Sequence, residues 1–220
     1  TVFFTEIYRP MKNKLLIFGG SGHAKDVMAV ARLMSYEEFQ IVTTNGSCDL
    51  DGLEAIPEAQ FSPKDFHDWD AFVASGNNAH RKRFFEDYPK LQFVSLIAPS
   101  AVVSESAILA PGVFIGAHAY IGPDAKLGEG AIANTHTIVG HDSIIGDYAQ
   151  VGPRTCIAGN VTVGKSVFIG AGAVINNGSP TKPLIIADEV TIGMACQVTA
   201  SIEQAGARLI PKPNYIAVKD

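Results

Sequence analysis

The chain has 220 residues, of which 47% are hydrophobic and 18% are charged, and its formal net charge is −5. This composition argues against intrinsic disorder, which requires low hydrophobicity and high net charge. The mild acidity argues against a general nucleic-acid-binding protein, and no apolar run of about 18 residues predicts a membrane span. Three widely spaced cysteines without a C-x-x-C pair favour a reducing cytoplasm over a disulfide framework or a thiolate zinc site, and no metal is expected.

The first ten residues differ from a signal peptide, because they lack a basic start followed by an apolar core. Met11 resembles a natural start. We therefore expect residues 1–10 to be an extension without a function of its own.

A strand, a glycine-rich loop and a helix follow one another near the start of the chain. Residues 14–18 form a short apolar run, residues 19–22 are Gly-Gly-Ser-Gly, and apolar residues at helical spacing predict a helix over 24–34. This order is typical of nucleotide-binding α/β domains, in which glycines let the backbone approach a phosphate and the helix N-terminus attracts it. The loop is not a complete G-x-G-x-x-G motif, so a tight turn without a ligand is the alternative interpretation.

Further elements of this first part are predicted as strands near 40–43, 71–75 and 93–97 and a helix over about 79–88. We therefore predict an α/β, Rossmann-like domain with a parallel sheet over residues 11–96. Ligands of such sheets bind beyond the carboxyl ends of the strands. The run from Arg81 to Arg83 is expected to be a solvated helix face.

The second part of the chain has a six-residue repeat. An aliphatic residue, or alanine once, occupies every sixth position from Ile97 to Ile175, and the next residue is usually small. Neither the helical period of 3.6 nor the strand period of 2 produces this repeat. A short strand followed by a corner does, and three such units close one triangular coil around an aliphatic core. The glycines that follow the aliphatic positions suit corners where side chains would collide or where a positive φ is required.

The repeat is interrupted after Ile175. Residues 176–183 are rich in turn formers and predict a protruding loop, after which the repeat resumes at Ile186. We predict a β-helix over residues 97–203 and a C-terminal cap over 204–220, since a capped solenoid protects its last coil from edge pairing.

One coil corner carries candidate chemistry. His141 is followed directly by Asp142, at corner positions away from the aliphatic core. A histidine beside a carboxylate can act as a general base, because the carboxylate stabilises the imidazolium that forms. For an isolated His-Asp pair, an exposed turn without function is the alternative.

Three motifs together resemble one family. They are Gly-Gly-Ser-Gly-His-Ala-Lys from Gly19, Ser-Gly-Asn-Asn from Ser75 with Arg81, and Asn-Thr-His-Thr-Ile-Val-Gly-His-Asp from Asn134. They resemble the sialic-acid O-acetyltransferases and the bacillosamine- and perosamine-type nucleotide-sugar N-acetyltransferases of bacterial surface-glycan synthesis. This resemblance spans about residues 14–202. It implies hexapeptide repeats folded as an all-β, left-handed parallel β-helix, and a homotrimer whose active sites lie between subunits.

The resemblance also implies the reaction and its residues. Acetyl-CoA, as co-substrate, would acetylate the amine of a nucleotide-linked amino sugar, with C4 of a 4-amino-4,6-dideoxy sugar preferred over O-acetylation of a sialic-acid-like sugar. His141 would be the catalytic base, Asp142 would strengthen it, and the Gly159 N–H would stabilise the oxyanion. The matching positions for acetyl-CoA are Gln150, Ala171, Gly193 and Met194, and those for the nucleotide sugar are Ser21, Gly22, His23, Thr43, Thr44, Gly76 and Asn77.

Two departures leave other functions open. Relatives often have acidic residues where this chain has Thr43 and Thr44, and a second histidine where it has Gln150, so a non-catalytic nucleotide-sugar-binding protein is one alternative. A zinc enzyme like the γ-class carbonic anhydrases is another, because His118 precedes His136 by one full coil. The corresponding position two coils before His136 is a serine, which argues against it.

Overall fold

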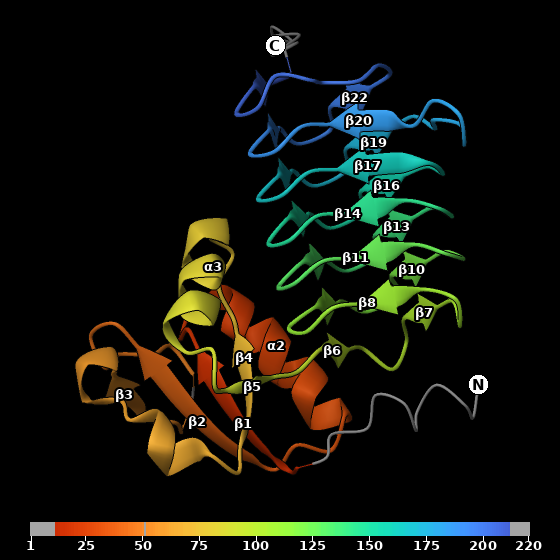
Figure 1. The fold of residues 1–220 in the computed structure, drawn as a ribbon. Helices are drawn as coiled ribbons and strands as arrows, with labels where there is room; N and C mark the ends of the chain where they lie inside the picture. Colours follow the sequence, from red (N-terminus) through yellow and green to blue (C-terminus); the bar gives the residue numbers. More distant parts are fainter. Residues whose placement is uncertain (1–11, 51, 212–220) are drawn as a thin grey trace, which may run out of the picture.

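The computed structural model describes residues 12–50 and 52–211 of the chain. The predicted extension at residues 1–10 and most of the predicted cap lie outside the described residues. The described chain forms an α/β domain followed by a tall three-sided β-helix, as Figure 1 shows.

The α/β domain contains a five-stranded parallel sheet with the order β3-β2-β1-β4-β5. The central strand β1 is almost wholly buried because both faces of the sheet are covered: residues of α2 pack on one face and Phe84 and Phe85 of α3 on the other. The elements are β1 (Lys14–Phe18), α2 (Gly22–Leu33), β2 (Glu38–Thr43), β3 (Ala55–Pro57), the 3-10 turns η1 (Glu58–Gln60) and η2 (Pro63–Phe66), β4 (Asp70–Val73), α3 (Asn78–Asp87) and β5 (Gln92–Phe93).

Three parallel sheets form the sides of the β-helix. One is called the covered face, and the other two are named after their first strands, β7 and β8. The covered face, against which the α/β domain packs, contains β6 (Leu96–Ile97), β9 (Phe114–Ile115), β12 (Ile132–Ala133), β15 (Gln150–Val151), β18 (Phe168–Ile169), β21 (Thr191–Ile192) and β23 (Arg208–Leu209). The β7 face contains β7 (Val102–Val103), β10 (Tyr120–Ile121), β13 (Ile138–Val139), β16 (Cys156–Ile157), β19 (Val174–Ile175) and β22 (Gln197–Val198). The β8 face contains β8 (Ile108–Leu109), β11 (Lys126–Leu127), β14 (Ile144–Ile145), β17 (Val161–Val163) and β20 (Leu184–Ile186).

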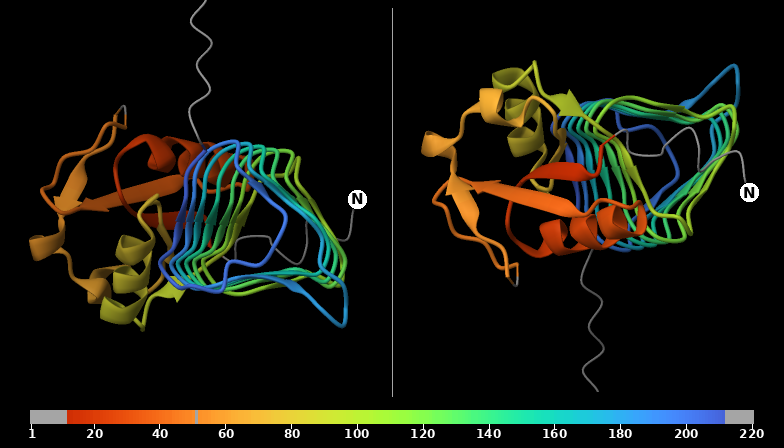
Figure 2. Two further views of the ribbon diagram at one scale, coloured as in Figure 1. Left: turned by 90° about the horizontal axis from the view of Figure 1, so that it is seen from above. Right: turned by 90° about the horizontal axis from the view of Figure 1, so that it is seen from below.

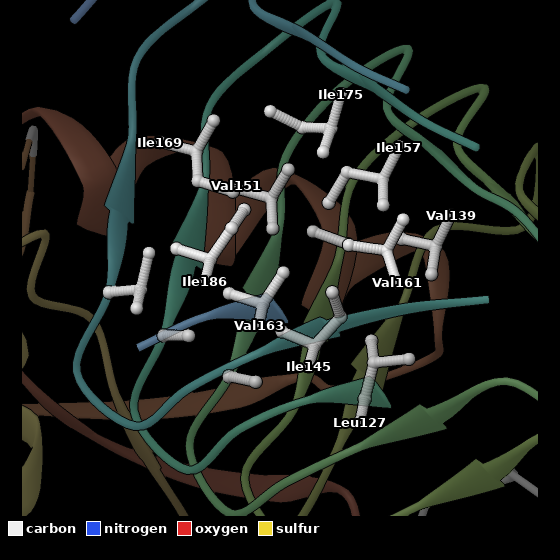
Figure 3. Close-up of a cluster of buried hydrophobic side chains, with 14 of the residues drawn as sticks. Leu127, Val139, Ile145, Val151, Ile157, Val161, Val163, Ile169, Ile175 and Ile186 are labelled. Atoms are coloured by element: carbon white, nitrogen blue, oxygen red, sulfur yellow. The ribbon is translucent and has the colours of Figure 1, made fainter. Parts of the chain in front are cut away.

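The predicted aliphatic core is confirmed. The sixth-position residues from Ile97 to Ile175 belong to one hydrophobic cluster inside the prism, and Figure 3 shows ten labelled members pointing into it. Strand pairs lie one coil apart, as for Val139 and Ile157. Burying one such aliphatic side chain stabilises the folded chain by about 1.5–3 kcal/mol. Because the six-residue spacing places all of these side chains inside the prism, the spacing alone favours this fold.

The repeating glycines serve close packing between coils. A Cβ at Gly140 would lie 2.5 Å from the carbonyl carbon of Ala158 in the next coil, although the φ of Gly140 is not positive. The positive φ falls two residues later, at corner residues such as Asp124, Asp142 and Asn160. Of the two reasons expected for these glycines, collision is the one that applies.

The predicted loop interrupts the coils where expected. Val163 pairs with Ile186, 23 positions later, whereas Ile157 pairs with Ile175, 18 positions later. The extra residues form the loop 176–183, closed by an antiparallel bridge between Ser179 and Lys182. Figure 2 shows this loop projecting from the corner of the prism opposite the α/β domain.

Three details differ from the sequence-based expectation. The short strand β3 was not predicted, because three residues carry too little periodicity. The predicted strand over 93–97 is divided: β5 closes the α/β sheet, and β6 already belongs to the β-helix. Residues predicted as cap also contribute β23, which pairs with β21 and adds one more strand to the covered face.

Candidate active site

His141 and Asp142 lie on one edge of the prism. The corners between the β7 face and the β8 face stack into a column, here called the His141 edge, which contains residues 122–125, 140–143, 158–160 and 176–183. The aliphatic neighbours Val139 and Ile145 point inward and so force the corner between them outward. The side chains of His141 and Asp142 are accordingly 60% and 52% exposed.

The pair is arranged as a general base needs. Nδ1 of His141 lies 2.7 Å from Oδ2 of Asp142. Because a carboxylate can only accept a hydrogen bond, Nδ1 carries the proton and Nε2 keeps its lone pair free. Asp142 has a φ of 59°, close to those of the equivalent corner residues Asp124 and Asn160.

Gly159 lies directly against this ring, one coil further along the same edge. A Cβ at Gly159 would lie 2.5 Å from Nε2 of His141 and 2.6 Å from Cε1, so only glycine leaves the ring in place. Within the described residues, the Gly159 N–H donates no hydrogen bond, whereas its carbonyl accepts one from the Gly178 N–H at 3.0 Å. The three predicted catalytic residues are therefore together, and the loop 176–183 is anchored immediately beyond them.

A cavity of about 790 Å³ opens at the carboxyl ends of β1, β2 and β4, where the sequence predicts the nucleotide site. It is lined by Ser21, Thr43 and Thr44 from the predicted set, together with Ser75 and His80, among others. The other predicted substrate residues, Gly22, His23, Gly76 and Asn77, do not line this cavity. Asn77 instead caps α3 by accepting a hydrogen bond from the His80 N–H.

His23 lies between the two domains, with its side chain only 13% exposed. Its ring meets Phe114 of the covered face edge-on, with the centroids 5.1 Å apart. Burial, together with the nearby positive charge of Arg81, lowers the pKa of His23 to about 4, so the ring is neutral near pH 7. Its nearest acidic group is Asp26, 4.0 Å from Nδ1.

Three buried polar atoms around this region have no hydrogen-bond partner in the described part of the chain: Nε2 of His23, Oγ1 of Thr43 and Oε1 of Gln150. Gln150 faces the loop between β4 and α3, since a Cβ at Gly76 would lie 3.7 Å from its Oε1. Buried polar groups are nearly always paired in native proteins. Thr43 lines the cavity of the α/β domain, whereas His23 and Gln150 lie where this domain meets the covered face, so polar atoms that a ligand could pair with are present at both places.

The remaining predicted coenzyme positions lie elsewhere. Ala171, Gly193 and Met194 belong to corners between the covered face and the β7 face, a column here called the His136 edge, which also contains His118 and Arg154. Within one chain this edge is separated from the His141 edge by the width of the β7 face. Gln150 belongs to neither edge, because it lies in β15.

The zinc alternative is not supported by the arrangement of the histidines. The rings of His118 and His136 are 5.0 Å apart on the His136 edge, but His141 lies on the other edge. Among the described residues, no group of three His, Cys, Asp or Glu side chains is placed to hold a metal ion.

The described helices also include none that could cross a bilayer.

The expectation of a solvated helix face from Arg81 to Arg83 is wrong for Arg81, which is fully buried between the two domains. Burial lowers the pKa of its guanidinium to about 9, which leaves it charged at neutral pH. The available signal was its position in α3, three and four residues before the buried Phe84 and Phe85. Asn78, one turn earlier on the same side, belongs to the quoted Ser-Gly-Asn-Asn motif but was assigned no role of its own.

Comparison with known families agrees with both parts of this fold. Residues 14–88 match the PglD N-terminal domain family, and residues 142–177 match the bacterial transferase hexapeptide family of six repeats. The predicted architecture, an α/β domain followed by a left-handed parallel β-helix, is confirmed.

Solved structures match over most of the chain. A variant of perosamine N-acetyltransferase from Caulobacter crescentus, in complex with CoA and GDP-perosamine, is 28% identical with a TM-score of 0.83, covering 90% of this chain and 93% of that chain. WeeI from Acinetobacter baumannii AYE is 26% identical with a TM-score of 0.81, covering 90% and 97%. The acetyltransferase domain of PglB from Neisseria gonorrhoeae FA1090, in complex with acetyl coenzyme A, is 27% identical with a TM-score of 0.80, covering 92% and 98%.

Proposed function

We propose that this chain, a hexapeptide-repeat sugar acetyltransferase by fold and by motif, transfers the acetyl group of acetyl-CoA to the amine of a nucleotide-linked amino sugar. The observation that carries the proposal is the arrangement of His141, with its free Nε2 against Gly159 and its Nδ1 bonded to Asp142. The solved relatives in complex with CoA, acetyl-CoA and GDP-perosamine support the choice of substrates.

In the proposed reaction the sugar amine attacks the thioester carbonyl while Nε2 of His141 takes its proton. Asp142 stabilises the resulting imidazolium, and the N–H of Gly159 donates to the developing oxyanion. The tetrahedral intermediate then collapses, the carbon–sulfur bond breaks, and the imidazolium returns the proton to the leaving thiolate. The products are an N-acetylated sugar and CoA, so atoms and charge balance without a metal.

The acceptor is proposed to lie across the junction of the two domains. The cavity beyond β1, β2 and β4 is large enough for a nucleotide, and the N-terminus of α2 at Gly22 favours a phosphate. The unpaired atom of Thr43 gives a polar ligand a hydrogen-bond partner in this cavity, and those of His23 and Gln150 give it partners at the junction. We prefer a 4-amino-4,6-dideoxy sugar, modified at C4 for bacterial surface glycans in the cytoplasm, where acetyl-CoA is available.

One chain does not form this site alone. The α/β domain packs on the covered face, and the His141 edge is the corner opposite that face (Figure 2). The sugar pocket of a chain is therefore remote from its own catalytic pair. In the proposed site a second protomer supplies one of the two halves, which agrees with the homotrimer that the family resemblance implies.

The β7 face is the surface best suited to pair with other copies. It exposes an apolar column along the height of the prism, formed by Val102, Tyr120, Ile138 and Val174. Contiguous exposed apolar surface of this kind marks interaction sites. If three β7 faces meet around a threefold axis parallel to the long axis of the prism, the His136 edge of each protomer adjoins the His141 edge of the next at equal height. Ala171 and Met194 of one chain then share a groove with His141 and Gly159 of another, as the proposed acetyl-CoA site requires.

Cross-linking tests this arrangement. A chain carrying both His118→Cys and Asp124→Cys has one thiol on each edge, at corners of the same coil. Because each link joins the His136 edge of one protomer to the His141 edge of the next, a short bis-maleimide is expected to produce a covalent trimer, measured by denaturing electrophoresis.

The matched control is His118→Cys with Lys165→Cys, which places the second thiol on the edge between the β8 face and the covered face. Both pairs are made in a chain carrying Cys156→Ser, because Cys156 is partly exposed in β16 on the proposed interface itself. The control pair and the parent chain with Cys156→Ser are expected to remain monomeric on the gel. Equal cross-linking of both double variants, or linkage that stops at dimers, would contradict the proposed trimer.

Turnover tests the function itself. Release of free CoA thiol should depend on both acetyl-CoA and an amino-sugar nucleotide, and the product should be heavier by one acetyl group in mass spectrometry. The panel should include UDP- and GDP-linked 4-amino-4,6-dideoxy sugars and CMP-sialic acid. Acetylation of the sialic acid alone would favour O-transfer, and binding without turnover across the panel would favour the non-catalytic alternative.

A further inference from the structure

The start of α3 contacts three successive coils of the β-helix. Nε of Arg81 donates to the Gly130 carbonyl at 2.8 Å, and Nη2 donates to the Tyr148 carbonyl at 2.5 Å. Nδ2 of Asn78 donates to the Ser166 carbonyl at 2.8 Å. These carbonyls are 18 residues apart along the chain and therefore stack one above another, so two side chains from one domain bond to three levels of the other.

Arg81 also bonds to the loop between β4 and α3, and Asn78 in turn bonds to Arg81. Nη1 of Arg81 donates to the Ser75 carbonyl at 2.8 Å, and Nη2 donates to Oδ1 of Asn78 at 2.9 Å. Ser75 lines the nucleotide cavity, and the next residue, Gly76, faces Gln150. A single guanidinium thus connects the rim of the cavity to the coils that carry the covered face.

The buried position makes this connection rigid. Arg81 is 1% exposed, and four acceptors hold its planar group. Removing one partner of a buried charged network leaves the others unpaired, which costs more than loss of a surface contact. Arg83, two residues later, provides a contrast, because its ion pair with Glu58 lies at the surface within the α/β domain.

We propose that Asn78 and Arg81 form a positioning clamp that fixes the nucleotide-sugar pocket against the β-helix, so that the sugar reaches His141 of the next protomer. The inference rests on the proposed function. The clamp contacts neither substrate nor the reacting atoms. Its role is to set the distance between two sites that belong to different domains, and a misplacement of about 1 Å can lower a rate on the order of 10²-fold.

Arg81→Ala in the full-length chain tests the clamp. The nucleotide cavity lies within the α/β domain, so the dissociation constant for UDP or GDP is expected to stay within about threefold while kcat falls about tenfold or more. Guanidinium ion at low millimolar concentration is expected to restore part of kcat by occupying the vacated site. Hydrogen exchange of the peptide spanning residues 75–78 is expected to accelerate.

Arg83→Ala is the matched control and should leave all these measurements unchanged. If Arg81→Ala does not fold, Asn78→Ala removes the bonds to Ser166 and Val167 and should shift kcat and exchange in the same direction. A folded Arg81→Ala with unchanged kcat and unchanged exchange would overturn the clamp, as would a parallel loss of nucleotide affinity and kcat without rescue. Exchange does not require turnover, so faster exchange in a chain without acetyl transfer would retain the clamp and reject the proposed function.

Discussion

His141→Ala is expected to lower kcat for acetyl transfer by about 10²–10⁴-fold, the usual contribution of a general base. The imidazole is exposed and lies against Gly159 at the corner of the prism, so its removal leaves no cavity in the aliphatic core. Steady-state kinetics with saturating acetyl-CoA would measure the loss, and calorimetry would measure coenzyme binding, which should survive.

His67→Ala is a suitable control, because this histidine lies at the surface of the α/β domain next to η2, far from both edges. Asp142→Asn keeps the size of the carboxylate but removes its charge, and it should lower kcat less than His141→Ala does. Retention of full activity in His141→Ala would remove the proposed mechanism, whatever the substrate.

Gly159→Ala is expected to lower kcat on the order of 10²-fold with little change in the free energy of unfolding. The added Cβ would lie 2.5 Å from Nε2 of His141, so the ring must swing away from its position against Asp142 and Gly159. An exposed ring can move at small cost, since surface substitutions usually change stability by less than about 0.5 kcal/mol. Kinetics and thermal unfolding of the same variant would separate the two effects.

Gly140→Ala, one residue before His141, is expected to lower stability, in contrast to Gly159→Ala. There the Cβ would collide with backbone atoms of Ala158 and Gly159, which cannot move away without disturbing the next coil. Overpacking of this kind costs about 1–3 kcal/mol, so this variant should lose stability. A Gly159→Ala variant that is as unstable as Gly140→Ala, or that keeps full activity, would contradict the role given to Gly159.

Much of the fold follows from local pattern. The six-residue repeat predicts the β-helix because each coil repeats the same local problem, namely an inward aliphatic residue followed by a close approach to the next coil. The strand β1, its glycine-rich loop and the helix α2 could likewise be predicted from residues that are neighbours in the sequence. The sequence-based prediction was wrong for two strands. The strand β3 was not predicted because it has only three residues, and the strand predicted over 93–97 is in fact two strands that belong to different sheets.

Part of the candidate site could also be predicted. His141 and Asp142 are adjacent in sequence, and their corner is exposed because its flanking residues are buried, so their pairing needed no long-range information. Gly159 is exactly one coil away, and once the repeat is known its place beside His141 follows. The loop 176–183 was visible as a break in the same repeat.

The sequence by itself thus determined the two architectures, the exposed corner with the adjacent His141 and Asp142, and the glycine-rich loop after β1, since each depends on residues close in the chain or related by a constant period. Only the tertiary structure decided that Arg81 is buried, that Gln150 faces Gly76, and that the α/β domain lies opposite the His141 edge. These features depend on how one domain docks on one of three similar faces. That choice is made by contacts between distant residues, such as Arg81 with Gly130 and Tyr148, and no local periodicity encodes it.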